Sequence, residues 1–128
     1  MLYAIICYNN DDLVSNWSKA EDDAVMQRLM GVTQKIAAAG KLGPVARLQP
    51  TRKAKVLRKG KDGPVVTDGP FAETKEHLLG FYLVDCQNVE EAVEIAKELQ
   101  AANAGPSSYD IRPVMFFNPG VKLATAAE

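Results

Sequence analysis

Leu78-Leu79-Gly80-Phe81-Tyr82-Leu83-Val84 is the stretch that decides the fold, because it is apolar at nearly every position. Successive side chains of a strand point to opposite faces of the sheet, so this run presents bulky apolar groups on both faces. Leu2 to Tyr8 has the same character, and turn residues follow it from Asn9 to Asp12. The sequence therefore predicts two central strands in a sheet that is covered on both faces.

A helix pattern follows each central strand. Ser18 with Glu21 three residues later is a capping-box signature, and Asn88 with Glu91 opens the second helix. Gly40 stands where a glycine ends the first helix. The apolar stripes have helical spacing; they are Val25, Leu29, Val32 and Ile36 in the first helix, and Val89, Ala92, Val93, Ala96 and Leu99 in the second. Two amphipathic helices are therefore expected.

Three further strand segments are shorter or interrupted. Leu42 to Gln49 is apolar but contains a proline, which predicts a short, interrupted strand. Ala54 to Lys59 is a clearer strand, and Lys61-Asp62-Gly63 after it indicates a hairpin. Tyr109 to Phe117 is expected as the last strand, at a sheet edge or with a bulge, because it contains Pro113.

The order strand, helix, strand, hairpin, strand, helix, strand predicts an α+β fold of the ferredoxin-like βαββαβ type with an extra hairpin. Two helices cover only one face of such a sheet. The apolar second face predicts a homodimer in which two copies pack sheet to sheet. In this arrangement the strands at 2–8 and 78–84 are expected to be parallel neighbours, so that Cys7 and Cys86 lie at corresponding ends.

Length and composition exclude several classes of protein. The chain has 128 residues, 47% hydrophobic and 24% charged, which fits one ordinary globular domain. A formal net charge of -1 gives no excess positive field for nucleic acid or an anionic bilayer. No leader pattern opens the chain, and no run approaches the roughly 18 apolar residues of a spanning helix, so we expect a soluble, cytoplasmic protein. Its two cysteines are expected as buried free thiols.

Basic side chains gather around the strand predicted at 54–59. They are Arg47, Arg52, Lys53, Lys55, Arg58, Lys59 and Lys61. Lysine at a sheet edge is a common protection against sticking to other sheets, so a solvated or edge strand is the favoured interpretation. A surface for an anionic ligand or an acidic partner is the alternative.

The segment 67–77 is the part of the chain that is densest in reactive groups. Its candidate site residues are Asp68, Phe71, Glu73, Lys75, Glu76 and His77. Such groups supply a general acid, a general base or an anion clamp when a cleft buries them beside a charge. The alternative is a solvated loop with exposed ion pairs, each worth under about 1 kcal/mol. Phe71 is either a pocket wall or a loop anchor.

His77 is a candidate general base if Asp68 or Glu76 orients its ring, and otherwise a half-buried surface histidine. Two arginines on separate predicted strands, Arg47 and Arg112, either reach one anionic group or pair with structural carboxylates. Both alternatives remain open from the residues alone.

No motif supports a metal, a nucleotide cofactor or a serine nucleophile. The carboxylates and the histidine lack HExxH or CxxC spacing. Neither G-x-G-x-x-G nor G-x-x-x-x-G-K-[ST] is present, and no G-x-S-x-G elbow occurs. We therefore expect no metal and no cofactor.

The reactive segment also resembles a family signature. This signature is that of the DGPF-domain branch of the YCII-related family, and it is matched by Thr67-Asp68-Gly69-Pro70-Phe71-Ala72-Glu73-Thr74-Lys75-Glu76 followed by Gly80-Phe81-Tyr82. The resemblance extends to Tyr3-Ala4-Ile5-Ile6, Leu48-Gln49-Pro50, Glu90-Glu91-Ala92 and Ile111-Arg112-Pro113-Val114. It covers residues 1–117 as one domain and leaves 118–128 as a flexible C-terminal tail.

The resemblance implies a ferredoxin-like, dimeric α/β barrel. Members of the family are similar to small bacterial proteins without an assigned reaction, some of them encoded beside or fused to extracytoplasmic-function sigma factors. In the YCII branch a histidine and an aspartate have been proposed to act as a pair in a cleft. Asp68 matches the aspartate, whereas that histidine has no matching position here and His77 only adjoins the motif.

Two functional hypotheses follow. In the first, the protein is a small-molecule binding protein or small enzyme with a pocket at the motif loop and the dimer interface. Asp68 and His77 are then the catalytic candidates, with Asp68 as base or hydrogen-bond acceptor, and the expected ligand contacts are Phe71, Glu73, Lys75, Glu76, Arg47 and Arg112. In the second, it is a regulatory interaction module linked to transcription initiation through a sigma factor.

Overall fold

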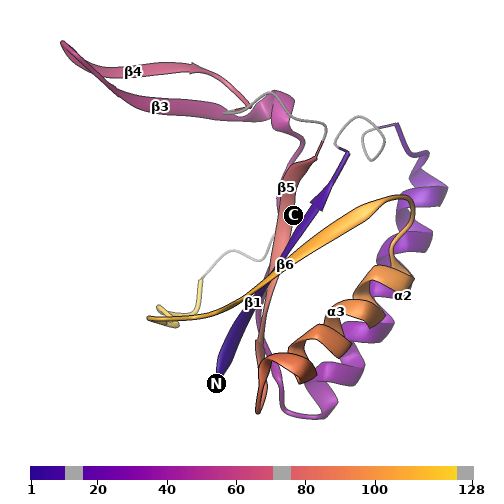
Figure 1. The fold of residues 1–128 in the computed structure, drawn as a ribbon. Coiled ribbons are helices and arrows are strands. Elements are labelled where there is room, and N and C mark those ends of the chain that lie inside the picture. Colours follow the sequence, from indigo (N-terminus) through magenta and orange to yellow (C-terminus); the bar gives the residue numbers. More distant parts are fainter. Residues whose placement is uncertain (11–15, 71–75, 124–128) are drawn as a thin grey trace.

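The main sheet has four strands. The structure, a computed structural model, describes residues 1–10, 16–70 and 76–123. The strands are β1 (Leu2–Asn9), β2 (Leu42–Arg47), β5 (His77–Asp85) and β6 (Ser107–Pro113), in the order β2-β5-β1-β6 (Figure 1). Every neighbouring pair is antiparallel. With its two helices this is an α+β architecture, compatible with the ferredoxin-like fold that the element order predicts.

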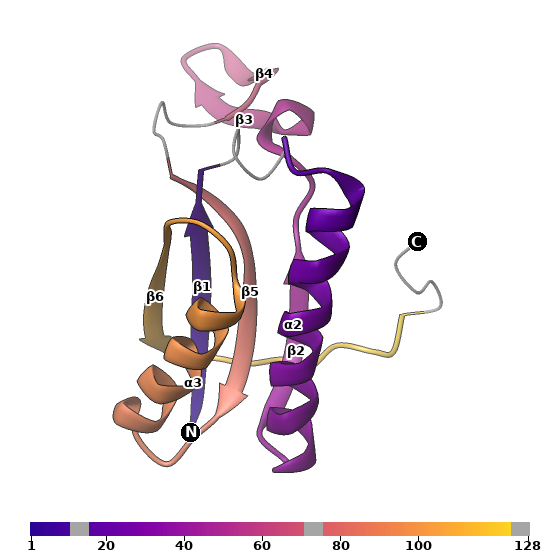
Figure 2. The same cartoon turned by 90° about the vertical axis from the view of Figure 1, so that its right-hand side faces the viewer.

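Both helices lie on the same side of this sheet (Figure 2). They are α2 (Lys19–Ala38) and α3 (Val89–Ala102), each running alongside the strands that it covers. The opposite face of the sheet carries no helix in the described part of the chain. We call this surface the helix-free face.

The helix ends follow the signals in the sequence. The hydroxyl of Ser18 accepts a hydrogen bond from the backbone N–H of Glu21, whose carboxylate accepts one from the N–H of Ser18. Asn88 Oδ1 accepts from the N–H of Glu91 at 2.9 Å and caps α3. Gly40 has a φ of 74°, a left-handed conformation that glycine adopts with little strain, so it ends α2 as predicted.

The core lies between the sheet and the helices. Its buried residues are Tyr3, Ile5, Ile36, Val84, Cys86, Ala92, Ile95, Ala96 and Leu99. The buried stripe of α3 differs from the predicted one at four positions: Ile95 and Ala102 are buried, Val93 is only partly buried, and Val89, the first helical residue, is 41% exposed. The buried stripe therefore runs from Ala92 to Ala102, and its residues keep helical spacing.

The predicted direction of the two central strands is wrong. β1 and β5 are neighbours but antiparallel, with Leu2 opposite Asp85 and Asn9 opposite His77. β5 lies between β1 and β2 and is antiparallel to both, so the strands that α2 connects are the ones that run in the same direction. Cys7 and Cys86 are free and buried, as expected, but they lie at opposite ends of the sheet.

The predicted extra hairpin is a separate two-stranded sheet. A short 3-10 helix, η1 (Thr51–Lys53), leads into β3 (Lys55–Gly60), and β4 (Gly63–Asp68) returns antiparallel to it. Gly63, with a φ of 129°, allows the tight reversal. The hairpin projects away from the main sheet (Figure 1), and most of its side chains are exposed, so the basic strand is solvated.

The last strand is shorter than predicted. β6 is an edge strand, as expected, but it ends at Pro113 and not at Phe117. One more backbone hydrogen bond, from the N–H of Val114 to the carbonyl of Leu2, follows its end. Beyond it Met115 and Phe116 are exposed, and chain without helix or strand continues to residue 123. Within the described ranges we find no helix of the length and apolarity needed to cross a membrane.

Candidate functional site

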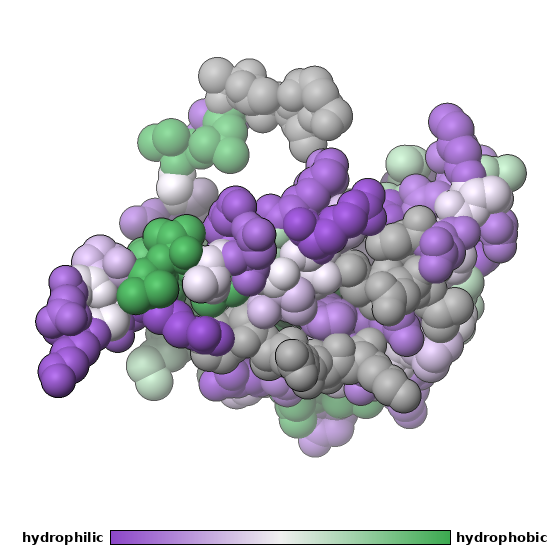
Figure 3. Space-filling model, turned by 90° about the horizontal axis from the view of Figure 1, so that it is seen from above, coloured by the Kyte–Doolittle hydropathy of each residue, from purple (hydrophilic) through white to green (hydrophobic). Residues whose placement is uncertain are grey.

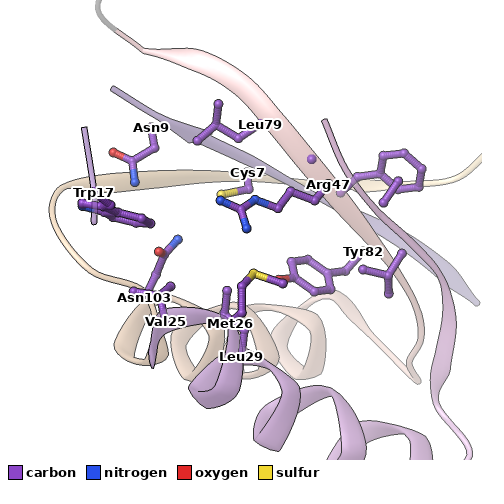
Figure 4. A pocket seen from close by; sticks show the side chains of 14 residues that line it. Cys7, Asn9, Trp17, Val25, Met26, Leu29, Arg47, Leu79, Tyr82 and Asn103 are labelled. Atoms are coloured by element: carbon purple, nitrogen blue, oxygen red, sulfur yellow. The ribbon is translucent and has the colours of Figure 1, made fainter. Parts of the chain in front are cut away.

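A pocket of about 100 Å³ lies between α2 and the sheet (Figure 4). One wall comes from α2, through Val25, Met26 and Leu29, which recur at helical spacing. The opposite wall comes from β5, through Leu79, Gly80 and Tyr82. The pocket is therefore largely apolar and is built by the two elements that carry the strongest apolar patterns in the sequence.

Polar groups gather at one end of the pocket. Asn9, Trp17 and Asn103 line it there, and Figure 4 shows them on the same side of the open space. The amide of Asn103 donates to the hydroxyl of Tyr109 at 3.2 Å. Asn9 is 1% exposed, and its Oδ1 accepts from the N–H of Asn10 at 2.7 Å. These contacts hold two amides in fixed positions beside the apolar walls.

Arg47 enters the pocket from the edge strand β2 (Figure 4). Its Nη2 donates to Asp22 Oδ1 at 2.7 Å, and its Nη1 lies 3.4 Å from Asp22 Oδ2. The two side chains are 45% and 35% exposed. The ion pair therefore joins β2 to the first turns of α2 at the rim of the pocket, where water still reaches it.

The ionisable groups inside the pocket stay neutral near pH 7. Burial raises the pKa of the Cys7 thiol, and a hydrogen bond with Tyr109 lowers it by a smaller amount. Burial is also the largest cause that raises the pKa of Tyr82 to about 12. Arg47 is the one charged side chain among the described residues that line the pocket. The described lining thus carries one positive side chain, at the rim, and no negative one.

A local irregularity in the sheet shapes the pocket. Cys7 pairs with Gly80 and Tyr8 with Leu78, so Leu79 is an extra residue in β5, and Leu79 lines the pocket. Such bulges are frequent beside functional sites because they redirect side chains. At Gly80 a side chain would overlap the backbone carbonyl of Ala46 on β2, which explains why glycine stands at this close approach.

Asp68 lies away from this pocket, on the projecting hairpin. It is the last residue of β4, and its carboxylate accepts a hydrogen bond from Lys55 Nζ on β3 at 2.5 Å. Its side chain is 82% exposed. Glu76, also exposed, accepts a hydrogen bond from the hydroxyl of Ser108 at 2.7 Å. Phe71, Glu73 and Lys75 lie outside the described residues.

The two candidate arginines are not brought together. Arg47 is on β2 and Arg112 on β6, the opposite edges of the four-stranded sheet. Three strand spacings of about 4.8 Å separate these edges by about 14 Å. Arg112 is paired with Ala4 and is exposed. Of the two, Arg47 alone lines the pocket.

His77 begins β5 opposite Asn9, and Ser107 lies on the other side of Asn9 in β6. His77 Nδ1 and Ser107 Oγ are both buried and have no hydrogen-bond partner among the described residues. His77 is half-buried, in agreement with one of the two interpretations from the sequence. In the pairing of the strands His77 is opposite Asn9, whereas Asp68 is on the separate hairpin.

Several pocket residues were not among the candidates from the sequence. They are Cys7, Asn9, Trp17, Tyr82 and Asn103. A signal exists for two of them: alternate positions 3, 5, 7 and 9 of β1 share the helix side, so Cys7 and Asn9 are the polar end of a buried face. Trp17 and Asn103 come from loops at helix ends, and only the packing of both helices brings them together.

The chain is similar to known proteins along nearly its whole length. A protein of Rhizobium meliloti (strain 1021), described as uncharacterised, is 52% identical over 120 residues, which cover 94% of this chain and 97% of the relative. Residues 1–118 match the YCII-related domain. The chain belongs to the YCII-related family.

Proposed function

We propose that this protein binds a small organic molecule in the pocket between α2 and the sheet. The observation that carries the proposal is the composition of the pocket: among the described lining residues it has apolar walls, fixed amides at one end and one charged side chain, Arg47. Ligand sites in proteins are typically concave and mostly apolar with a few polar groups that orient the ligand. The bulge at Leu79 beside this pocket supports the same assignment.

The size of the pocket limits the ligand. An apolar protein cavity of about 150 Å³ is large enough to hold benzene. The pocket here has about 100 Å³, so the enclosed part of the ligand is a small group. Trp17 and Arg47 are only partly buried, so the remainder of a ligand has a way to solvent. A branched chain of four or five carbons with one polar end is a suitable probe.

Trp17 provides a direct measurement. It is the only tryptophan in the chain and lines the pocket. Titration with isovaleramide, a neutral branched amide, is expected to change its fluorescence saturably, with a dissociation constant on the order of 1 mM. Val45 is an exposed pocket residue, and Val45→Phe is expected to weaken the response at least about tenfold because the larger ring fills part of the pocket.

The matched control is Val66→Phe, at an exposed position on the hairpin. It should leave the fluorescence response unchanged. A wild-type chain whose Trp17 fluorescence does not respond to isovaleramide would contradict the proposed pocket.

Asp68→Asn tests whether the motif loop holds the site instead. The pair with Lys55 is exposed and worth under about 1 kcal/mol, so the variant is expected to fold normally and to bind isovaleramide like the wild type. Loss of binding in a folded Asp68→Asn protein would move the site to the motif of the DGPF branch.

We also propose the dimeric barrel. Ala4 is opposite Leu83 and Ile6 opposite Phe81, and these four apolar residues alternate with those that face the helices, so they lie on the helix-free face. A second copy packed on this face by two-fold symmetry removes it from water.

The assignment of the chain to the DGPF branch of the family is also a proposal, and it rests on the motif Thr67–Glu76.

A second candidate function, a regulatory interaction module, is favoured by the hairpin. Leu57 and Val66 are paired across its two strands and exposed, and Val65 next to them is exposed as well. Figure 3 shows hydrophobic atoms at the hairpin bordered by hydrophilic ones. An apolar patch among lysines and arginines fits a partner surface that is apolar at its centre and acidic around it. In this case isovaleramide leaves Trp17 fluorescence unchanged.

A further inference from the structure

We propose that the ligand of the pocket is a small carboxylic acid, bound as its anion, whose carboxylate takes the place of Asp22 on Arg47. The proposal rests on the proposed binding function and adds the chemical class of the ligand. It also assigns Asp22 as an internal competitor that occupies the arginine when the pocket is free.

The charges around the pocket favour an anion. Arg47 is the one charged side chain among the described lining residues, and the thiol of Cys7 and the phenol of Tyr82 are protonated near pH 7. A carboxylate that enters the pocket therefore contacts a guanidinium and neutral groups. None of the described lining side chains is negative. For a cationic ligand, the described lining residues offer no negative side chain, and the one carboxylate at the rim, that of Asp22, is already paired with Arg47.

The geometry at Arg47 is that of carboxylate recognition. A guanidinium presents five N–H donors in a planar fork, and the contact with Asp22 uses one from each terminal nitrogen. One of these contacts is short, at 2.7 Å, and the other is long, at 3.4 Å, so Asp22 satisfies the fork unevenly. A ligand carboxylate that is free to orient can make both contacts well.

Asp22 is a weak competitor. Both partners are more than a third exposed, and ion pairs of this kind typically contribute between about 0 and 1 kcal/mol. The apolar body of a ligand in the pocket adds burial that Asp22 cannot supply, because it is on α2 at the rim. In Figure 4 the guanidinium of Arg47 extends into the space between the sheet and α2, where such a body would lie.

Isovalerate and isovaleramide test the proposal, since they share one apolar body and differ in charge. At neutral pH, Trp17 fluorescence is expected to show isovalerate binding at least about fivefold tighter than isovaleramide, because hydrogen bonds to charged groups are stronger than neutral ones. Arg47→Gln removes the charge and is expected to abolish this preference, so that the two probes bind to the variant with similar affinity.

Asp22→Asn removes the competitor and is expected to tighten isovalerate binding about two- to fivefold, without effect on isovaleramide. The matched control is Asp23→Asn, because Asp23 is in the same part of α2 but pairs with Lys19 at 2.8 Å. It should leave the affinity for both probes unchanged. Thermal unfolding of each variant verifies that it is folded.

The outcomes separate the two proposals. Equal binding of isovalerate and isovaleramide, or a preference for the acid that survives Arg47→Gln, overturns the carboxylate assignment and leaves the pocket standing. Equal effects of Asp22→Asn and Asp23→Asn overturn the role of Asp22. Absence of binding by both probes overturns the pocket itself, and with it this inference.

Discussion

At the scale of single residues, Glu91 joins two elements. Its Oε2 accepts a hydrogen bond from Lys41 Nζ at 2.8 Å, and its Oε1 accepts one from the N–H of Gln87 at 3.2 Å. The contact with Lys41 is the largest cause that lowers the pKa of Glu91, and the same contact raises the pKa of Lys41. The start of α3 is thereby tied to the turn that precedes β2.

Glu91→Gln is expected to destabilise the protein in a pH-dependent way. A carboxylate whose pKa is lower in the folded than in the unfolded state stabilises the fold above its unfolded pKa, and this contribution is lost as the pH falls through the folded pKa. The variant should therefore be less stable than the wild type at neutral pH, and the difference should disappear in acid. Urea unfolding at a series of pH values measures it.

Glu94→Gln is the control for Glu91→Gln. Glu94 is in the same helix and pairs at the surface with Lys97, without joining two elements. If both variants lose the same stability at neutral pH, the loss reflects helix charge in general and not the bond to Lys41.

At the scale of elements, α3 supplies the deepest part of the core. Leu99 is fully buried against the sheet, whereas Val89 at the start of the same helix is largely exposed. The two positions were equivalent members of one stripe in the sequence. The structure separates them because the buried stripe continues towards the C-terminal end of the helix, through Ala102.

Leu99→Ala is expected to lower the free energy of unfolding by about 2–5 kcal/mol, since it removes a buried side chain and leaves a cavity. Val89→Ala should change it by less than about 0.5 kcal/mol, as an exposed substitution in a helix. Urea denaturation gives both values. Similar losses for the two variants would show that α3 packs along the predicted stripe after all.

Local sequence signals predicted the helices and strands well. They did not predict how these elements are arranged in three dimensions. Ser18, Asn88 and Gly40 mark the helix ends because capping depends on neighbouring residues alone. The relative direction of β1 and β5 depends on how the elements between them connect the two strands. It was predicted as parallel and is antiparallel. Of the candidate site residues that the structure describes, Arg47 alone lines the pocket. Reactive residues that are neighbours in the sequence do not indicate which helix and strands will enclose a pocket.

At the scale of the whole molecule, the topology leaves one face of the main sheet, the helix-free face, without helices. Two helices on one side leave the strands at 2–9 and 77–85 with apolar residues on the other, among them Ile6 and Phe81. This face is therefore the surface on which we propose that a second copy packs.

Ile6→Lys is expected to convert a wild-type dimer to a monomer, because a lysine at the centre of an apolar interface is desolvated without a partner. The dissociation constant should rise at least about a hundredfold. Sedimentation at micromolar concentration measures the state of both proteins. Leu57→Lys on the projecting hairpin is the control and should leave the dimer intact; a monomeric wild type would remove the proposed barrel.

The antiparallel course of β1 and β5 also determines what oxidation can do to the protein. Gly80 is the partner of Cys7, and Cys86 is six residues further along the chain, about 20 Å away at 3.4 Å per residue. A disulfide needs Cα atoms within about 7 Å. The native chain therefore cannot close a ring through its own two thiols, and any cystine that forms without unfolding must join two separate molecules, as a covalent cross-link.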